Sequence, residues 1–171
     1  MTKYSIYKLS PHEFLKTKTS DQYDIRIWKP NHIYDFPPTL GLKHLMWNIF
    51  HFLKIFNNSD YCILYLKEKK KIVHRSCVLP GSFQFPFVKR LDLQVSSTWT
   101  DPKYRNKGLA QIALTAVCNY HLFCERTFWY VTREDNVSSI KVCEKIGFKF
   151  FSIVTRRRFI FFSLYKKFPP P

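Results

Sequence analysis

The residues with the clearest chemical content lie in one short stretch, where a strand pattern ends and a helix pattern begins. The strand pattern stops at Asp101-Pro102, a basic loop follows, and a helix of small residues starts at Gly108. The first backbone amides of a helix have no acceptor inside the helix, and the helix dipole favours negative charge beside them. This stretch therefore predicts a binding site for a phosphate or a diphosphate.

The backbone of this loop and of the first helical turn should make the contact. Arg105 and Lys107 add positive charge, while Gly108 and Ala110 have little or no side chain to hold an anion away. The expected set is Arg105, Asn106, Lys107, Gly108, Leu109 and Ala110. A solvated basic turn is the alternative interpretation, and these residues alone do not decide between the two.

Two motifs together resemble the GNAT superfamily of N-acetyltransferases, and they cover about residues 95–148. Arg105-x-x-Gly108-x-Ala110, after a strand and before a helix, is similar to the acetyl-CoA loop of that family. The stretch Asn136-Val-Ser-Ser-Ile-Lys-Val-Cys143-Glu-Lys-Ile-Gly147-Phe148 is similar to a second family motif. The resemblance implies an α/β fold with a mixed, mostly antiparallel sheet flanked by helices and splayed beside the central strand.

The resemblance also implies a single domain, spanning residues 1–171, whose two halves bind different substrates. The half from about residue 91 onward would bind acetyl-CoA or another acyl-CoA, and the half up to about residue 90 would recognise the acceptor. Thr98, Trp99 and Thr100 would pair with the pantetheine arm like an added strand. Asn136 would also reach the pantetheine arm, and the acceptor amine would attack the thioester directly in a ternary complex.

Few residues are candidates for a general acid or a general base. Asp92, on the polar face of the expected central strand, and His74, on the preceding strand, are the candidate bases that would deprotonate the amine. Cys143 stands where related enzymes often place a tyrosine that protonates the leaving thiolate. Three interpretations of Cys143 stay open: it is the acid, it is an ordinary buried cysteine with solvent as the acid, or it marks a degenerate site.

The acceptor is less sharply indicated than the cofactor. The excess of 28 Lys and Arg over 12 Asp and Glu gives a charge of +16, which favours anionic partners. We expect the primary amine of a small molecule, such as a phosphorylated or nucleotide-linked amino sugar. A protein N-acetyltransferase and a non-catalytic acyl-CoA-binding module are the alternatives. Aromatic and basic residues of the first half would form either an acceptor pocket or core: Trp28, Lys29, His32, Tyr34, His44, Trp47 and His51.

Other classes are disfavoured by composition. Five cysteines without a CxxC spacing indicate neither a metal site nor a disulfide framework, and they suit a reducing, cytoplasmic environment. No apolar run reaches the roughly 18 residues of a membrane span. No nucleic-acid-binding motif accompanies the positive charge, so nucleic acid is an unexpected partner. A homodimer is left open.

The elements that must position these residues follow from hydrophobic periodicity and breaker residues. Strands are expected at residues 4–9, 24–28, 61–67, 72–79, 91–100, 127–132, 148–155 and 159–165. Helices are expected at residues 40–56, 108–122 and 136–146. In the first helix His44, Asn48 and His51 form a polar stripe on the side away from the apolar residues. In the strand at 91–100 one face should be buried, and Arg156-Arg157-Arg158 should form a solvated hairpin turn.

Overall fold

The computed structural model describes residues 3–11, 22–37, 39–40, 43–82, 86–121, 125–158 and 163–167. Eight strands and three α-helices lie in these ranges: β1 (Lys3–Leu9), β2 (Asp24–Trp28), α1 (Lys43–Phe52), β3 (Cys62–Glu68), β4 (Lys71–Pro80), β5 (Leu93–Thr100), α2 (Leu109–Tyr120), β6 (Phe128–Arg133), α3 (Val137–Lys145), β7 (Lys149–Arg158) and β8 (Ser163–Lys167). A short 3-10 helix, Pro102–Tyr104, joins β5 to the loop before α2.

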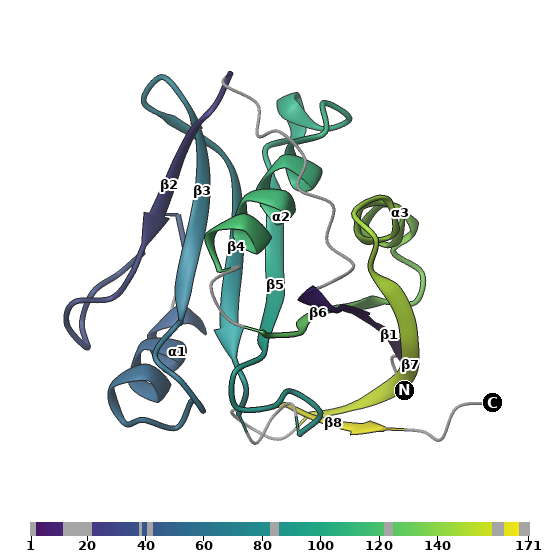
Figure 1. The fold of residues 1–171 in the computed structure, drawn as a ribbon. Coiled ribbons are helices and arrows are strands. Elements are labelled where there is room, and N and C mark those ends of the chain that lie inside the picture. Colours follow the sequence, from purple (N-terminus) through teal and green to yellow (C-terminus); the bar gives the residue numbers. More distant parts are fainter. Residues whose placement is uncertain are drawn as a thin grey trace.

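The strands form one sheet in the order β2-β3-β4-β5-β6-β1-β7-β8. Every neighbouring pair is antiparallel except β5 and β6, which are parallel. Figure 1 shows α2 lying across the middle strands and α3 beside it, while α1 lies near one end of β2 and β3. This arrangement confirms the expected mixed, mostly antiparallel α/β fold.

The helix α2 follows its sequence pattern closely. Leu109, Ala113, Ala116 and Val117 recur at helical spacing and are all buried against the sheet. The helix packs on β3, β4 and β5, and its neighbour α3 packs on α2 and β6. The largest core cluster therefore joins both helices to the middle strands, and it fixes the loop before α2 relative to the end of β5.

The helix α1 lies in the opposite orientation to the one its polar stripe predicts. Its polar residues His44 and Asn48 are buried, whereas Leu53, just past its end, is 63% exposed. His44 contacts the Cys77 thiol through Nε2 at 3.6 Å, and the Asn48 amide donates to the Asp35 carbonyl. Because these polar groups find hydrogen-bonding partners in the rest of the protein, they can be buried even though the sequence pattern places them on the polar side of the helix.

The central strand and the final hairpin also differ from expectation. Both faces of the first half of β5 are buried, because Gln94 on one face is 2% exposed and Leu93 and Val95 on the other face are fully buried. Asp92, just before the strand, is also buried, at 6% exposed. The strand β7 continues through Arg158, so the three arginines pair with β8 instead of forming a turn. Residues 159–162 of the last expected strand lie outside the described residues. No helix in the described ranges is long and apolar enough to cross a membrane.

Candidate functional site

The sheet opens beside β5. The parallel ladder between β5 and β6 contains only Leu93↔Phe128, Gln94↔Trp129 and Val95↔Tyr130. Beyond this point the two strands are no longer paired, and Figure 1 shows β6 running away from β5 toward β1. The second half of β5 thus has an edge that β6 does not pair.

A β-bulge reorients the residues of β5 at the point where the strands separate. On β4, Cys77 pairs with Ser96 and Arg75 pairs with Trp99, so Ser97 and Thr98 share a single partner position. Ser97 has a φ of 48°, in the left-handed region. The hydroxyls of Thr98 and Ser76 lie 3.4 Å apart, on the same face of the sheet as α2.

Asp101 anchors the turn that follows β5. One carboxylate oxygen accepts a hydrogen bond from the Lys103 amide at 2.9 Å, and the other lies 2.7 Å from the Lys71 ammonium. The hydrogen bond from Lys71 and the one from the Lys103 backbone hold the pKa of Asp101 below its ordinary value. Tyr104, in the same turn, donates a hydrogen bond from its hydroxyl to the Glu68 carboxylate. The turn is therefore fixed to the β3–β4 end of the sheet.

The start of α2 leaves its first backbone donors without a side-chain cap. Gly108 precedes the helix with a φ of 77°, and no side chain caps the first turn. The first intrahelical bond in this turn runs from the Ile112 amide to the Gly108 carbonyl at 3.0 Å, so the amides before Ile112 have no acceptor in the helix. A Cβ built on Gly108 would meet nothing within 4 Å. The space in front of these amides is open, and the glycine is needed for its backbone conformation.

A cavity of about 630 Å³ joins the open edge of β5 to these amides. All predicted cofactor-binding residues except Lys107 line this cavity: Thr98, Trp99, Thr100, Arg105, Asn106, Gly108, Leu109, Ala110 and Asn136. Lys107 places its ammonium 5.0 Å above the Tyr104 ring instead. Residues from two motifs about thirty positions apart along the chain thus share one cavity, and its size suits a small-molecule ligand. In the described ranges no cluster of His, Cys, Asp or Glu could hold a metal ion.

The sequence reasoning did not anticipate the remaining lining residues. They are Tyr104, Gln111, Tyr130, Ser138, Ser139, Lys141, Val142 and Lys145. Five of these lie on α3, and the recurrence of 138, 141, 142 and 145 at helical spacing is the signal that could have found them. Tyr130 is a buried residue of β6 whose hydroxyl hydrogen-bonds the side chains of Ser139 and Thr98. It lies at the last paired position before the strands diverge.

His74 lies behind the cavity wall. Its side chain is buried, with Nδ1 2.8 Å from the Thr100 hydroxyl and Nε2 3.0 Å from the Ser76 hydroxyl. Burial, with a smaller effect from the charge of Arg75, lowers the pKa of His74 to about 4. The imidazole is therefore neutral at physiological pH. It contacts the cavity-lining residue Thr100 directly and approaches Thr98 through the Ser76 hydroxyl.

Asp92 lies outside the cavity lining and is fully engaged in local structure. Its carboxylate accepts hydrogen bonds from the Lys89 amide at 3.2 Å, the Thr127 amide at 3.1 Å and the Trp129 indole at 2.9 Å. These contacts join the starts of β5 and β6, where the parallel ladder begins. Three donors satisfy this buried carboxylate, so its contacts are structural.

Cys143 is buried and does not line the cavity. Its thiol donates to the Ile140 carbonyl at 3.1 Å, one turn back along α3. Burial raises the pKa of the thiol to about 12. This environment fits the ordinary buried cysteine, one of the three interpretations left open by the sequence.

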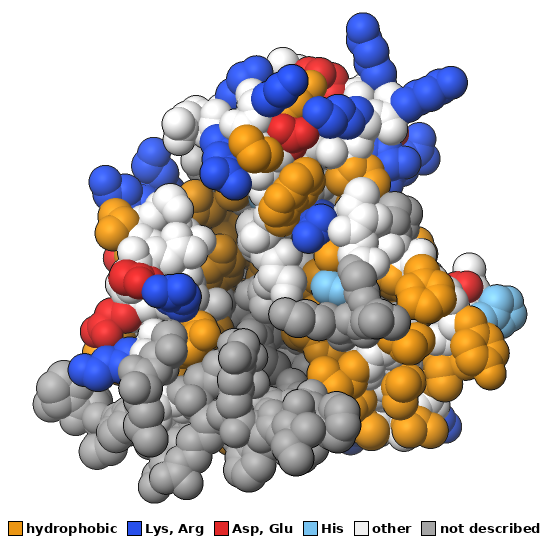
Figure 2. Space-filling view, turned by 180° about the vertical axis from the view of Figure 1, so that it is seen from behind, with side chains coloured by type: hydrophobic (Ala, Val, Ile, Leu, Met, Phe, Trp, Pro, Cys, Tyr) orange, Lys and Arg blue, Asp and Glu red, His pale blue; other side chains and the backbone are white. Residues whose placement is uncertain are grey.

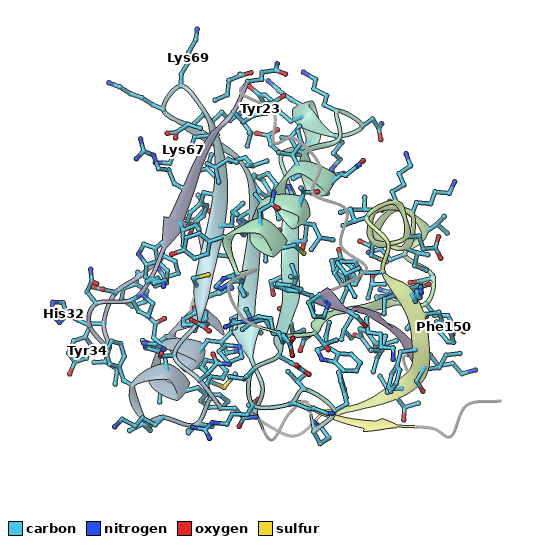
Figure 3. All side chains as sticks on the ribbon, viewed as in Figure 1. Tyr23, His32, Tyr34, Lys67, Lys69 and Phe150 are labelled. Carbon is cyan, nitrogen blue, oxygen red and sulfur yellow. The ribbon has the colours of Figure 1, made fainter. Side chains whose placement is uncertain are left out.

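The aromatic residues of the first half divide between core and surface. Trp47, His51 and Trp28 pack around the buried ring of Tyr61. Figure 3 shows His32 and Tyr34 projecting away from the protein, from the loop between β2 and α1. Hydrophobic side chains gather over α1 and this loop, at the lower right of Figure 2. A second, shallower hollow of about 430 Å³ is lined by Ile27, Trp28, Lys29, Asn31 and Tyr120.

Comparison with known proteins gives one family match and several proteins with a similar fold. Residues 27–148 match the model of the acetyltransferase (GNAT) family. The fold is similar to that of a Drosophila protein at 14% identity, with 89% of this chain and 48% of that one covered and a TM-score of 0.61. It is also similar to a putative acetyltransferase of the same family from Novosphingobium aromaticivorans, at 12% identity, 89% and 61% coverage and a TM-score of 0.58.

The Escherichia coli ribosomal-protein-S18-alanine N-acetyltransferase is a third similar structure, at 17% identity, 79% and 82% coverage and a TM-score of 0.51. None of the curated protein sequences compared with the chain matches it. The chain spans about half the length of the Drosophila protein and about three fifths of the Novosphingobium protein.

Proposed function

We propose that this chain, which belongs to the acetyltransferase (GNAT) family, transfers an acyl group from acyl-CoA to a primary amine. The observation that carries the proposal is the single cavity joining the free amides of α2 to the open edge of β5. Free amides at a helix start suit a diphosphate, and an unpaired strand edge suits the amide-containing pantetheine arm. Coenzyme A contains both groups, joined end to end.

Each part of the cavity has one task in this proposal. The amides from Gly108 to Gln111, with Arg105, would hold the diphosphate. The backbone of Thr98, Trp99 and Thr100 would hydrogen-bond the pantetheine arm, and Asn136 would contact it from α3. A backbone N–H at the bulge would polarise the thioester carbonyl, because its donor is fixed before the reaction begins. Acetyl-CoA is the co-substrate we expect.

The chain needs no nucleophile of its own. The amine nitrogen forms a bond to the thioester carbon, the carbon–sulfur bond breaks, and the amine gives up one proton to water. Tyr130 is the hydroxyl best placed to give a proton to the departing sulfur. The other tyrosine of the cavity, Tyr104, already donates to Glu68, and Cys143 faces the Ile140 carbonyl. Solvent would then reprotonate Tyr130 through the hydroxyls of Thr98 and Ser139.

The acceptor we favour is the primary amine of a small molecule, such as a nucleotide-linked amino sugar. The surplus of 16 positive charges supports an anionic acceptor. A protein N-terminus is the second candidate, because the fold is similar to that of an enzyme acting on the alanine of ribosomal protein S18. The residues up to about 90, including the hollow beside Trp28 and Lys29, would recognise either acceptor.

Two measurements test the proposal in order. Acetyl-CoA should raise the melting temperature in a concentration-dependent manner, because a ligand that binds only the folded state stabilises it. Thioester consumption should then be followed with a panel of amino sugars, nucleotide-linked amino sugars and peptides with free N-termini. No thermal shift at millimolar acetyl-CoA would overturn the cofactor site. A shift without turnover on any amine would leave a non-catalytic acyl-CoA-binding module.

A further inference from the structure

Two polar residues of β4, His74 and Ser76, lie in a layer of the core that is otherwise apolar. Their partners on β3 are Leu66 and Leu64, which belong to the core cluster that packs against α2. His74 is fully buried and Ser76 is 1% exposed. Burying such groups costs free energy unless each is hydrogen-bonded, and an aliphatic residue at either position would avoid that cost. The fold alone therefore does not require a polar pair here.

Hydrogen bonds connect this pair to the cavity at both ends. The imidazole Nδ1 lies 2.8 Å from the Thr100 hydroxyl, and Nε2 lies 3.0 Å from the Ser76 hydroxyl. The Ser76 hydroxyl lies 3.4 Å from that of Thr98, which hydrogen-bonds the Tyr130 hydroxyl. Three residues of this chain line the cavity: Thr98, Thr100 and Tyr130. A continuous chain of hydrogen bonds therefore runs from the His74 imidazole to Tyr130 through two hydroxyls.

The direction of this chain depends on which nitrogen of the imidazole carries the proton. Because the ring is neutral, one nitrogen donates and the other accepts. With the proton on Nε2, the ring donates to Ser76, Ser76 donates to Thr98, and Thr98 donates to the phenol oxygen of Tyr130. The phenol proton can then be donated to a group in the cavity. With the proton on Nδ1 every bond reverses, and Tyr130 would donate into the chain instead.

Donation toward Tyr130 also opposes the effect of burial on its acidity. Burial is the larger effect and raises the pKa of Tyr130 above its ordinary value, while the hydrogen bonds with Ser139 and Thr98 lower it. Donors to the phenol oxygen stabilise the tyrosinate that remains when the proton has moved to the departing sulfur. Linked hydrogen bonds polarise one another in a low-dielectric core, so a fixed donor at the far end strengthens the bond at Tyr130. Hydrogen bonds at catalytic sites are often long before the ligand binds, which fits the 3.4 Å step from Ser76 to Thr98.

We propose that His74 is a positioning residue for the acyl transfer. It acts through the Ser76 and Thr98 hydroxyls to direct the Tyr130 proton into the cavity. This inference rests on the proposed function and gives the buried imidazole a task other than that of a base. Neither acyl-CoA nor the amine would touch the ring. Tyr130 gives its proton to the sulfur as the carbon–sulfur bond breaks, and Thr98 then passes it a proton from solvent, so the ring keeps its own.

The tautomer of His74 tests the direction of the chain without any substrate. Ring ¹⁵N chemical shifts distinguish a protonated nitrogen from a bare one, and the signals that disappear in His74→Gln identify the ring. We expect Nε2 to carry the proton at neutral pH and Nδ1 to accept from Thr100. A proton on Nδ1 would reverse the chain and overturn the inference, while leaving the proposed function intact.

The variant Ser76→Ala interrupts the chain while Thr100 still holds the imidazole. Ser76 is not among the lining residues, so the KM for acetyl-CoA should stay constant. The kcat with the fastest amine of the panel should fall about tenfold, as expected for one lost hydrogen bond. In Tyr130→Phe the chain has no hydroxyl to act on, so adding Ser76→Ala should lower kcat no further. Equal falls in the two backgrounds, or no fall in the wild-type background, would contradict the inference.

The matched control for this variant is Ser152→Ala. Ser152, on β7, is also 1% exposed, and its hydroxyl donates to the Ile153 carbonyl at 3.3 Å. The substitution should cost similar stability and leave kcat unchanged. A tenfold fall in kcat here too would mean that any buried hydroxyl of the sheet has this effect, and the inference would be wrong. No turnover on any amine would overturn the proposed function together with this inference, whereas turnover with additive effects would overturn the inference alone.

Discussion

Gly108 is the single residue on which the cofactor site depends most directly. Its φ of 77° is accessible to glycine at little cost, whereas alanine there costs about 1 kcal/mol and places a methyl group in the space before the amides. We expect Gly108→Ala to weaken acetyl-CoA binding about tenfold or more, with a modest loss of stability. Calorimetric titration and thermal unfolding measure the two effects.

The matched control for this variant is Gly147→Ala. Gly147 has a φ of 100° at the end of α3 and does not line the cavity. The substitution should lower stability through the same backbone strain and leave acetyl-CoA affinity unchanged. If Gly108→Ala bound acetyl-CoA like the wild type, the diphosphate would not lie against this turn.

Substitutions of Tyr130 and of Cys143 should have different effects on kcat. Tyr130→Phe removes a hydroxyl that lies in the cavity, so kcat should fall roughly 10²-fold while acetyl-CoA affinity stays nearly constant. Cys143→Ala removes a buried thiol, so it should lower stability by about 1 kcal/mol and leave kcat nearly unchanged. Steady-state kinetics with the best amine of the panel, together with cofactor titration, separate the two. An unchanged kcat in Tyr130→Phe would exclude it as the acid.

At the scale of elements, Asn136 has two tasks that can be separated. Its side-chain oxygen accepts from the Ser139 amide at 3.3 Å and caps α3, and its side chain also lines the cavity. Asn136→Ala should cost about 1 kcal/mol of stability through the lost cap. Asn136→Asp keeps a capping oxygen and removes the amide donor, so it should preserve the melting temperature and weaken acetyl-CoA binding. Unchanged cofactor affinity in both variants would limit Asn136 to capping.

The helices and strands next to the site were predictable because their periodicity agrees with their burial. The spacing of Leu109, Ala113 and Val117 predicts α2, and its Gly108 start follows from the same stretch. The bulge at Ser97 was not predictable, because it arises from unequal pairing between β4 and β5 and leaves no local signature. Likewise, the burial of Asp92 depends on Trp129, which lies 37 residues away along the chain.

In helix α1 the sequence pattern is clear, but tertiary contacts determine which side of the helix is buried. The spacing of His44 and Asn48 predicts a solvent-facing stripe, yet both residues are buried. His44 contacts Trp47 and the Cys77 thiol, and Asn48 donates to the Asp35 carbonyl. Periodicity locates a helix along the chain, while the side that faces the sheet depends on partners far away in sequence. The same limit kept Lys141 and Lys145 out of the expected site, since charged residues on a short helix are most often simply solvated.

At the scale of the whole molecule, the site lies where two parts of the sheet meet. The parallel ladder of β5 and β6 connects the strands β2 to β5 with the strands β6, β1, β7 and β8. Only three residue pairs form this ladder, yet the core cluster of α2 and α3 spans both parts. The fold thus keeps an open strand edge at its centre, because helix packing holds the two parts together where strand pairing does not.

Two buried histidines should make the stability of the whole domain depend on pH. Burial lowers the pKa of His74 and of His121 to about 4, from an ordinary value of 6.5. Between these values the unfolded chain binds protons that the folded chain does not, so the free energy of unfolding falls as the pH falls. Each histidine should contribute a loss of about 2 kcal/mol between pH 7.5 and pH 5.

Urea unfolding of the wild type and of His74→Gln at both pH values measures this dependence. Comparing each variant with itself removes the intrinsic cost of the substitution, so the drop in His74→Gln should be smaller than that of the wild type by about 2 kcal/mol. His32→Gln, on the exposed loop before α1, is the control and should show the full drop. If His74→Gln lost as much stability as the wild type between the two pH values, His74 would be protonated to the same extent in the folded and unfolded chain. Its burial behind Thr100 would then not exclude the proton.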